Sequence, residues 1–165
     1  MGRERAPVLL RGTVTRLNGE TDDLARYRGR VVLVVNTASE CINTGQLGEL
    51  EALYRAHRAR GFVVLGFPAN DFAGQEPRTN AQIAAFCERN FGVSFPMFAK
   101  GPVTGDRALG LFRRLAAASE PPSWNFTKYL LDRRGRLVQR FDPYLPADAP
   151  QVRAAIDELL ENRRS

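Results

Sequence analysis

The chain is poor in histidine and cysteine, two residue types that often perform chemistry in proteins. Its 165 residues include one histidine, His57, and two cysteines, Cys41 and Cys87. A structural zinc site takes four cysteine or histidine ligands, and a disulfide framework takes several cysteine pairs, so neither is expected. His57 lies in a charged stretch late in a predicted helix, where we expect a surface histidine without a catalytic role. We therefore predict no metal site and no bound cofactor.

Long apolar runs and lysines are also scarce. No run approaches the roughly 18 residues of a membrane-spanning helix, and the residues from Met1 to Pro7 carry charges where a secretory signal would be apolar. We therefore expect a cytoplasmic protein without integral membrane contact. The net charge of +6 comes almost entirely from arginines, which are dispersed along the chain and not interleaved with aromatic residues. This dispersal favours a solvated surface over a nucleic-acid interface.

The order of predicted elements indicates a single α/β domain over residues 1–165. Val31–Val35 and Phe62–Phe67 have the apolar, β-branched character of strands buried on both faces, and a helix with an apolar stripe is predicted from Gln46 to Arg60. A strand, a helix and a strand in this order predict a parallel pair with a right-handed crossover. The other predicted elements are strands at 8–10 and 13–17, helices at 79–90, 107–118 and 149–160, and a hairpin of 128–131 with 137–141.

Two local signals predict where elements begin and end. Asn18-Gly19 follows the strand predicted at 13–17 and is a strong hairpin signal. The segment from Thr79 to Gln82 has the pattern of a capping box, which opens a helix.

Cys41 stands in the loop Asn36–Thr44, between the first buried strand and its helix. Reactive groups in open α/β sheets gather beyond the carboxyl ends of the strands, where this loop lies. Free backbone N–H groups and the positive dipole end of a helix start favour a thiolate, the species that attacks an O–O bond. From its position alone, Cys41 could also be a small buried hydrophobic residue.

Five motifs stand in order across roughly Gly12 to Leu160: Asn36–Cys41, Leu65–Phe72, Gly74–Pro77, Phe95–Phe98 and Trp124–Lys128. Together they resemble the glutathione peroxidase family in its cysteine-containing, bacterial type. The resemblance implies a thioredoxin-like fold, with a central mixed β-sheet flanked by helices and an N-terminal β-hairpin. It also implies an oxidoreductase of the antioxidant response, a thiol peroxidase that reduces hydrogen peroxide and organic or lipid hydroperoxides.

The resemblance implies four site residues: Cys41 as the peroxidatic nucleophile, with Gln75, Trp124 and Asn125 around its sulfur. The Gln amide, the indole and the Asn amide supply uncharged N–H donors. Donors directed at sulfur stabilise the thiolate, and they can stabilise charge on the departing oxygen as an oxyanion hole does. Such a site needs neither a histidine nor a metal.

Four positions bear on how this site differs from the family pattern. Ile42 stands where the family commonly has glycine, which bears on the local backbone and on the access of large substrates. Asp71 stands where glutamine is usual, and an inward-pointing carboxylate would oppose thiolate formation. Ala69 stands where many cysteine-containing members have a resolving cysteine. Cys87 is the remaining candidate resolver, although it is one residue out of step with the usual position.

We therefore expect a one-cysteine cycle, in which Cys41 becomes a sulfenic acid that glutathione or thioredoxin reduces. The segment from Leu115 to Trp124 lacks the insertion that tetrameric members use to assemble, so a monomer is expected. Three alternatives stay open: a peroxide-sensing relay protein, a degenerate member that acts as a binding module, and a thioredoxin-type disulfide reductase. The last is disfavoured because Cys41–Thr44 has no second cysteine.

Overall fold

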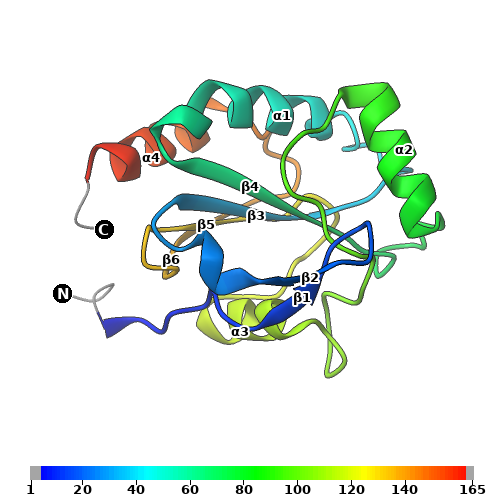
Figure 1. Cartoon of the computed structure of the whole chain (residues 1–165), viewed down its shortest axis with the longest axis horizontal. Helices are drawn as coiled ribbons and strands as arrows, with labels where there is room; N and C mark the ends of the chain where they lie inside the picture. Colours follow the sequence, from blue (N-terminus) through cyan, green and yellow to red (C-terminus); the bar gives the residue numbers. More distant parts are fainter. Residues whose placement is uncertain (1–4, 163–165) are drawn as a thin grey trace.

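A four-stranded sheet in the order β4–β3–β5–β6 forms the centre of the structure, a computed structural model that describes residues 5–162 (Figure 1). β3 pairs in parallel with β4 and antiparallel with β5, and β5 pairs antiparallel with β6. The sheet is therefore mixed, as the sequence predicts. Its strands are β3 (Val31–Thr37), β4 (Phe62–Pro68), β5 (Lys128–Leu131) and β6 (Leu137–Phe141).

Helices cover both faces of this sheet. α1 (Gln46–His57) and α4 (Pro150–Glu161) lie on one face, and α3 (Gly110–Ala118) lies on the other with the small sheet of β1 (Thr13–Thr15) and β2 (Thr21–Asp23) (Figure 1). The side chains of β3 alternate between two apolar clusters because successive residues of a strand point to opposite faces. Val31, Leu33 and Val35 join the cluster under α1 and α4, and Val32 and Val34 join the cluster under α3.

Most of the predicted elements are confirmed, with small shifts at their ends. α2 (Asn80–Phe91) begins at the predicted capping box, in which the side chains of Thr79 and Gln82 each accept a hydrogen bond from the other's backbone N–H. The Asn18-Gly19 turn joins β1 to β2, with Gly19 at a φ of 88°. The helix predicted at 46–60 is α1 followed by a short 3₁₀ helix, Arg58–Arg60. A second 3₁₀ helix, Leu24–Tyr27, follows β2.

The strand predicted at 8–10 is wrong. Leu9 and Leu10 are buried on the α3 side of the sheet, so their apolar character reflects burial and not strand pairing. Their carbonyl oxygens accept hydrogen bonds from arginine side chains, Arg114 to Leu9 and Arg28 to Leu10, where a strand would bond to a neighbouring strand. The helix predicted to begin at 107 begins at Gly110.

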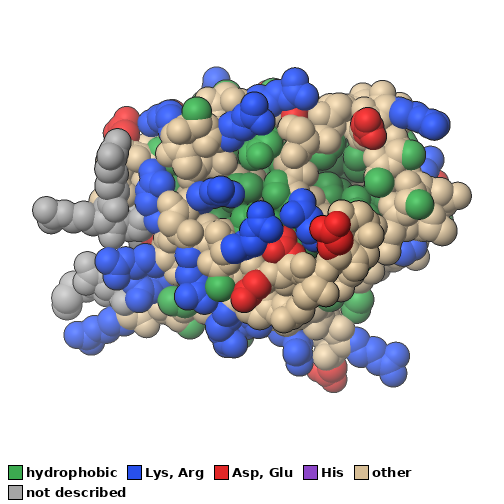
Figure 2. All heavy atoms as spheres, viewed as in Figure 1, with side chains coloured by type: hydrophobic (Ala, Val, Ile, Leu, Met, Phe, Trp, Pro, Cys, Tyr) green, Lys and Arg blue, Asp and Glu red, His purple; other side chains and the backbone are tan. Residues whose placement is uncertain are grey.

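Figure 2 shows lysine and arginine side chains spread over one face, with hydrophobic side chains between them. Nearly all of the positively charged residues of the chain are arginines. Several bind the protein's own backbone. The Arg133 guanidinium, for example, donates to the carbonyl oxygens of Gly29, Arg60 and Leu160, and so ties three chain segments together. Part of the positive charge is therefore structural. In the part of the chain that the structure describes, no helix is long and apolar enough to cross a membrane.

The β5–β6 turn leads to a stability prediction. Gly135 has a φ of 79°, and a Cβ atom there would lie 2.9 Å from Cβ of Leu10 and 3.3 Å from its backbone nitrogen. We expect Gly135→Ala to lower the free energy of unfolding by about 2–4 kcal/mol, from left-handed strain and from this contact together. Urea unfolding monitored by circular dichroism would measure the loss.

Gly105→Ala is the matched control. Gly105 has a φ of 75°, but a Cβ there would meet nothing within 4 Å. This variant should therefore show only the backbone strain, about 1 kcal/mol. Equal losses in the two variants would contradict a contribution from the Leu10 contact.

Candidate active site

Three chain segments meet at the carboxyl end of β3. The Cys41 loop leaves β3 at this edge, and the loop that contains Gln75 leaves the parallel strand β4 at the same edge. β5 runs antiparallel to β3, so the turn that contains Trp124 and Asn125 enters β5 there as well. The backbone N–H of Glu40 donates to the carbonyl oxygen of Gln75 over 3.0 Å, which joins the first two segments directly.

Asn36, fully buried near the end of β3, holds the third segment. Its Nδ2 donates to the carbonyl oxygen of Trp124 over 3.0 Å, and its own carbonyl oxygen accepts from the N–H of Phe126 over 2.7 Å. Phe126 has a φ of 70°, in the left-handed region that large residues rarely adopt. Such strain persists only where surrounding contacts fix the backbone, and here the Asn36 bond and complete burial of the Phe126 ring do so.

The Cys41 thiol is nearly buried, with 8% of the residue exposed. The backbone N–H of Asn43 donates to its Sγ over 3.3 Å. Thr44 fixes the loop, because its Oγ1 accepts from the N–H of Cys41 over 2.9 Å and donates to the carbonyl oxygen of Ala38 over 3.0 Å. α1 begins only at Gln46, so the sulfur lies at a turn that leads into the helix and not directly at its first residue.

Two of the predicted donors, Gln75 and Asn125, are in direct contact. Asn125 is fully buried, and its Nδ2 donates to Oε1 of Gln75 over 3.0 Å. Because the Gln75 oxygen is taken in this way, its Nε2 group is the part of the amide left to donate. Neither Gln75 Nε2 nor the indole Nε1 of Trp124 has a hydrogen-bond acceptor within residues 5–162. Trp124 packs against the apolar cluster that includes Cys41, and its ring centre lies 5.5 Å from that of Phe72.

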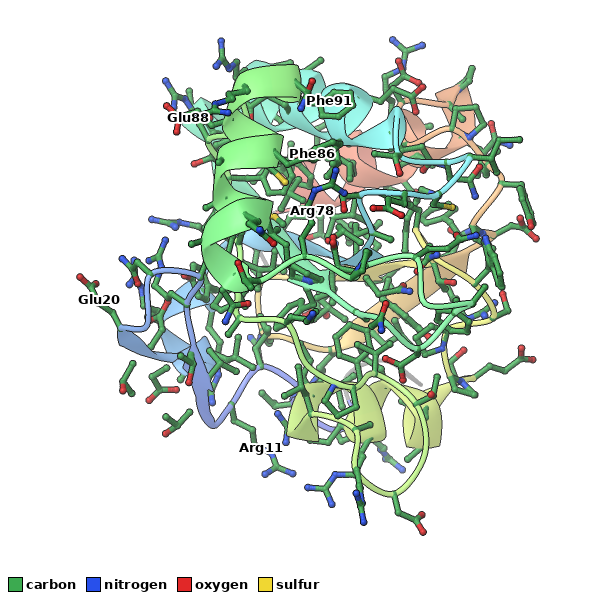
Figure 3. The ribbon with its side chains drawn as sticks, turned by 90° about the vertical axis from the view of Figure 1, so that its right-hand side faces the viewer. Arg11, Glu20, Arg78, Phe86, Glu88 and Phe91 are labelled. Carbon is green, nitrogen blue, oxygen red and sulfur yellow. The ribbon has the colours of Figure 1, made fainter. Side chains whose placement is uncertain are left out.

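A buried polar chain beside these residues was not predicted. Glu76 is 1% exposed, and its Oε1 accepts from Oγ of Ser39 over 2.6 Å. Ser39 Oγ in turn accepts from Nη1 of Arg78, which also lies 3.1 Å from Oε2 of Glu40. The Arg78 guanidinium sits over the ring of Phe86 on α2 at 4.6 Å, as Figure 3 shows. These hydrogen bonds join the loop before Cys41 to the loop after Gln75. Burial raises the pKa of Glu76, and the Ser39 hydrogen bond opposes that rise.

The departures from the family pattern do not disturb the site geometry. Ile42 is 90% exposed and is not among the described non-glycine residues with positive φ, so glycine is not required there. The Asp71 carboxylate accepts from the backbone N–H groups of Val103 and Thr104 and from the Thr104 hydroxyl, so it is engaged by that loop. Ala69 is completely buried.

Cys87 lies on the buried side of α2, with 4% of the residue exposed. Both cysteines are free, and both belong to the apolar cluster under α1 and α4. Burial, with a smaller contribution from the Glu76 carboxylate, raises the pKa of Cys87 to about 12. In this structure Cys87 is therefore a neutral thiol, which is a poor nucleophile.

His57 lies at the end of α1 and away from these segments. Its Nδ1 is 2.9 Å from the carbonyl oxygen of Leu53, and its Nε2 is 3.4 Å from Asp157 on α4. Its ring packs edge-on against Phe62 of β4. These contacts give His57 a structural place between two helices and the sheet. Within residues 5–162, no three His, Cys, Asp or Glu side chains are grouped as metal ligands would be.

Comparison with known proteins identifies the family. The sequence profile described as "Glutathione peroxidase" matches residues 9–116, which is more than half of the chain. The chain belongs to the glutathione peroxidase family. The "Glutathione peroxidase homolog BsaA" of Halalkalibacterium halodurans is 47% identical over 150 residues, 87% of this chain and 94% of that protein. The "Hydroperoxy fatty acid reductase gpx1" of Synechocystis is 43% identical over 155 residues, 87% of this chain and 90% of that protein.

Solved structures agree with this assignment. The crystal structure of Trypanosoma cruzi GPX1 superposes with a TM-score of 0.75 at 30% identity, covering 94% of this chain and 97% of that one. The predicted thioredoxin-like fold is thus confirmed, and this member of the glutathione peroxidase family is a thiol peroxidase.

The burial of Cys87 leads to a prediction on thiol reactivity. In Cys41→Ser, where Cys87 is the remaining cysteine, alkylation by iodoacetamide at pH 8 should be about a thousandfold slower in the folded protein than in urea. The reason is that each unit by which the pKa rises lowers the thiolate fraction tenfold, and burial limits access further. Timed alkylation followed by mass spectrometry measures both rates. Similar rates in the two states would contradict the buried, neutral thiol.

Proposed function

We propose that this glutathione peroxidase reduces hydrogen peroxide and organic hydroperoxides through Cys41, with Gln75, Trp124 and Asn125 as the residues that support the sulfur. The observation on which the proposal rests is the pair of unpartnered donors, Gln75 Nε2 and Trp124 Nε1, on segments that converge on the Cys41 loop. Both residues are half-buried, so these N–H groups are free to donate to a bound substrate or to a negative charge at the site.

The chemistry follows from these groups. The Cys41 thiolate attacks one oxygen of the hydroperoxide, the O–O bond breaks, and the sulfur becomes a sulfenic acid while the departing oxygen takes up a proton as alcohol or water. Uncharged N–H donors stabilise both the thiolate and the negative charge that develops on the departing oxygen. Asn125 acts indirectly, through Gln75. Its hydrogen bond to Oε1 of Gln75 fixes the direction in which Gln75 presents its own amide N–H.

Two exposed apolar residues favour organic hydroperoxides as substrates. Ile42 and Tyr144 are the exposed large hydrophobic side chains among residues 5–162, at 90% and 62%. Ile42 follows Cys41, and Tyr144 follows Pro143, whose carbonyl oxygen accepts from Nδ2 of Asn43. Both therefore border the Cys41 loop, where they can contact the hydrocarbon part of a substrate. The printed name of the Synechocystis relative, a hydroperoxy fatty acid reductase, supports the same substrate class.

We further propose a one-cysteine cycle. Cys87 is buried and neutral, so it is a poor resolving thiol, and an external thiol such as glutathione or thioredoxin would reduce the sulfenic acid of Cys41. The first thiol forms a mixed disulfide with Cys41 and releases water. A second external thiol then attacks this mixed disulfide. The Cys41 thiol is restored, and the two external thiols leave as a disulfide. We expect the protein to do this as a monomer.

The test is mass spectrometry of the reduced protein after one equivalent of hydrogen peroxide, with and without a sulfenic-acid trap. The expected result is a trapped adduct on Cys41 in the wild type and in Cys87→Ser, and none in Cys41→Ser. A disulfide between Cys41 and Cys87 would overturn the one-cysteine cycle and favour thioredoxin as the reductant. If Cys41 oxidised no faster than free cysteine, the peroxidase proposal itself would fail.

Trp124→Phe tests the donor role with little change in packing. Phenylalanine keeps an aromatic ring against Phe72 but lacks the indole N–H, so the rate of Cys41 oxidation by hydrogen peroxide should fall on the order of a hundredfold. Stopped-flow mixing with quenched mass analysis would measure the rate, and a melting curve would establish that the variant is folded. An unchanged rate in a folded variant would exclude the indole from the reaction.

A further inference from the structure

Lys128, the first residue of β5, is a charged side chain in the interior. It is 0% exposed, and among the described residues it forms no ion pair. Its Nζ donates to three carbonyl oxygens: Phe126 at 2.8 Å, Asp142 at 3.1 Å and Pro143 at 3.4 Å. A buried ammonium is costly to desolvate, and no carboxylate within residues 5–162 pairs with this one. Its hydrogen bonds to three carbonyl groups are therefore the interactions that offset this cost.

The Pro143 carbonyl oxygen connects Lys128 to the Cys41 loop. It accepts from Nζ of Lys128, from Nε2 of Gln46 over 2.7 Å and from Nδ2 of Asn43 over 3.3 Å. The backbone N–H of the same Asn43 donates to Sγ of Cys41. The Lys128 ammonium is thus linked to Sγ of Cys41 through the Pro143 carbonyl group and Asn43.

The other end of the Lys128 network reaches the opposite side of the site. Phe126, whose carbonyl oxygen accepts the shortest of the three bonds, belongs to the strained turn that contains Trp124 and Asn125. We propose that Lys128 is a positioning residue of the peroxidase reaction, holding the Asn125 turn and, through the Pro143 carbonyl, the Asn43 N–H that contacts the nucleophilic sulfur. This inference rests on the proposed role of Cys41.

The number of hydrogens on Lys128 matters for this role. An ammonium has three N–H groups for its three acceptors, whereas a neutral amine has two. Desolvation lowers the pKa of Lys128 to about 8, while the carboxylates of Asp142 and Glu49 oppose this shift. Those two are the charged groups that act on it, from the segment after β6 and from α1. Above about pH 8 the network therefore loses one donor.

The first test compares Lys128→Met with the wild type across pH 6.5–9.5, measuring the single-turnover rate of Cys41 oxidation by hydrogen peroxide. Below pH 7.5 the variant should be about tenfold slower, the effect of losing a charge-assisted hydrogen bond. The difference should become smaller by pH 9.5, because the wild-type lysine is then neutral and keeps only two of its three donors. Cys41 ionises in both proteins, so dividing one rate by the other cancels the pH dependence that this shared ionisation causes. A ratio that stays constant with pH, or that stays within twofold of one, would overturn the proposal.

Stability provides a second readout. Lys128→Met leaves the carbonyl oxygens of Phe126 and Asp142 without this donor, so it should melt at a lower temperature than the wild type. A purely structural lysine would lower the melting temperature and leave the oxidation rate of the folded protein unchanged at every pH, and that outcome would overturn the proposal. Arg113→Met, at an exposed position of α3, is the control: it also exchanges one positive charge for methionine and should leave the oxidation rate unchanged.

Asn43→Ala tests the path through the Pro143 carbonyl from its other end, and it does not depend on the folding of Lys128→Met. This variant should be about tenfold slower near neutral pH and should lose the same alkaline dependence relative to the wild type. Because Asn43 acts through a carbonyl that Lys128 also holds, the loss in the double variant should be clearly less than a hundredfold. Additive losses would overturn the path. A wild type that does not react with peroxide at any pH would instead remove the proposed function itself.

Discussion

The site depends on the two different neighbours of one buried strand. β3 has a parallel partner on one side and an antiparallel partner on the other, so the segment that leaves β4 and the segment that enters β5 arrive at the same edge. That is why residues far apart in the chain, such as Gln75 and Asn125, can share a hydrogen bond. An all-parallel sheet would send the turn before β5 to the opposite edge. The mixed topology is thus a condition for the active site and not only a feature of the architecture.

The proposed site would activate a thiol with little charge. The backbone N–H of Asn43 contacts the sulfur, and the charged side chains of the surrounding segments contact other groups. Lys128 acts on carbonyl groups, Arg78 acts on the Ser39 hydroxyl, and the Asp71 carboxylate is bound by the 103–104 loop. Unlike a charged donor, a neutral N–H group brings no charge of its own that has to be desolvated. The single histidine, between α1, α4 and the sheet, is not needed for this chemistry.

The sequence is sufficient to predict the elements whose signals are local. The capping box at Thr79 and the turn at Asn18-Gly19 depend on residues within a few positions of one another, and both are confirmed. The strand predicted at 8–10 is wrong, because a segment that packs on one face of the sheet needs the same apolar residues as a buried strand. Family resemblance predicts the roles of Cys41, Gln75, Trp124 and Asn125, and these roles stay predictions. No local rule indicates that a loop glutamine will meet a turn asparagine 50 residues later, as Gln75 and Asn125 do.

Glu76 and Lys128 were missed for a physical reason. Glutamate and lysine are almost always exposed, so composition assigns them to the surface by default. The sequence does contain one indication that Lys128 is buried. It is the first residue of Lys-Tyr-Leu-Leu, an otherwise apolar run that forms a fully buried strand. Its acceptors, however, are backbone oxygens, and the position of a carbonyl group is decided by the fold and not by the residue that carries it.

The wide separation in sequence of the site segments has a consequence for biosynthesis. The Asn43 side chain donates to the carbonyl oxygen of Pro143, which lies 100 residues later in the chain. A ribosome adding about 5–20 residues per second delivers that acceptor roughly 5–20 seconds after Asn43 itself. Until residues 124–128 have been made, the nascent chain lacks the indole, the Asn125 amide and the Lys128 ammonium that we propose act on the Cys41 site. The proposed peroxidase environment of the thiol is therefore complete only when most of the chain has been made.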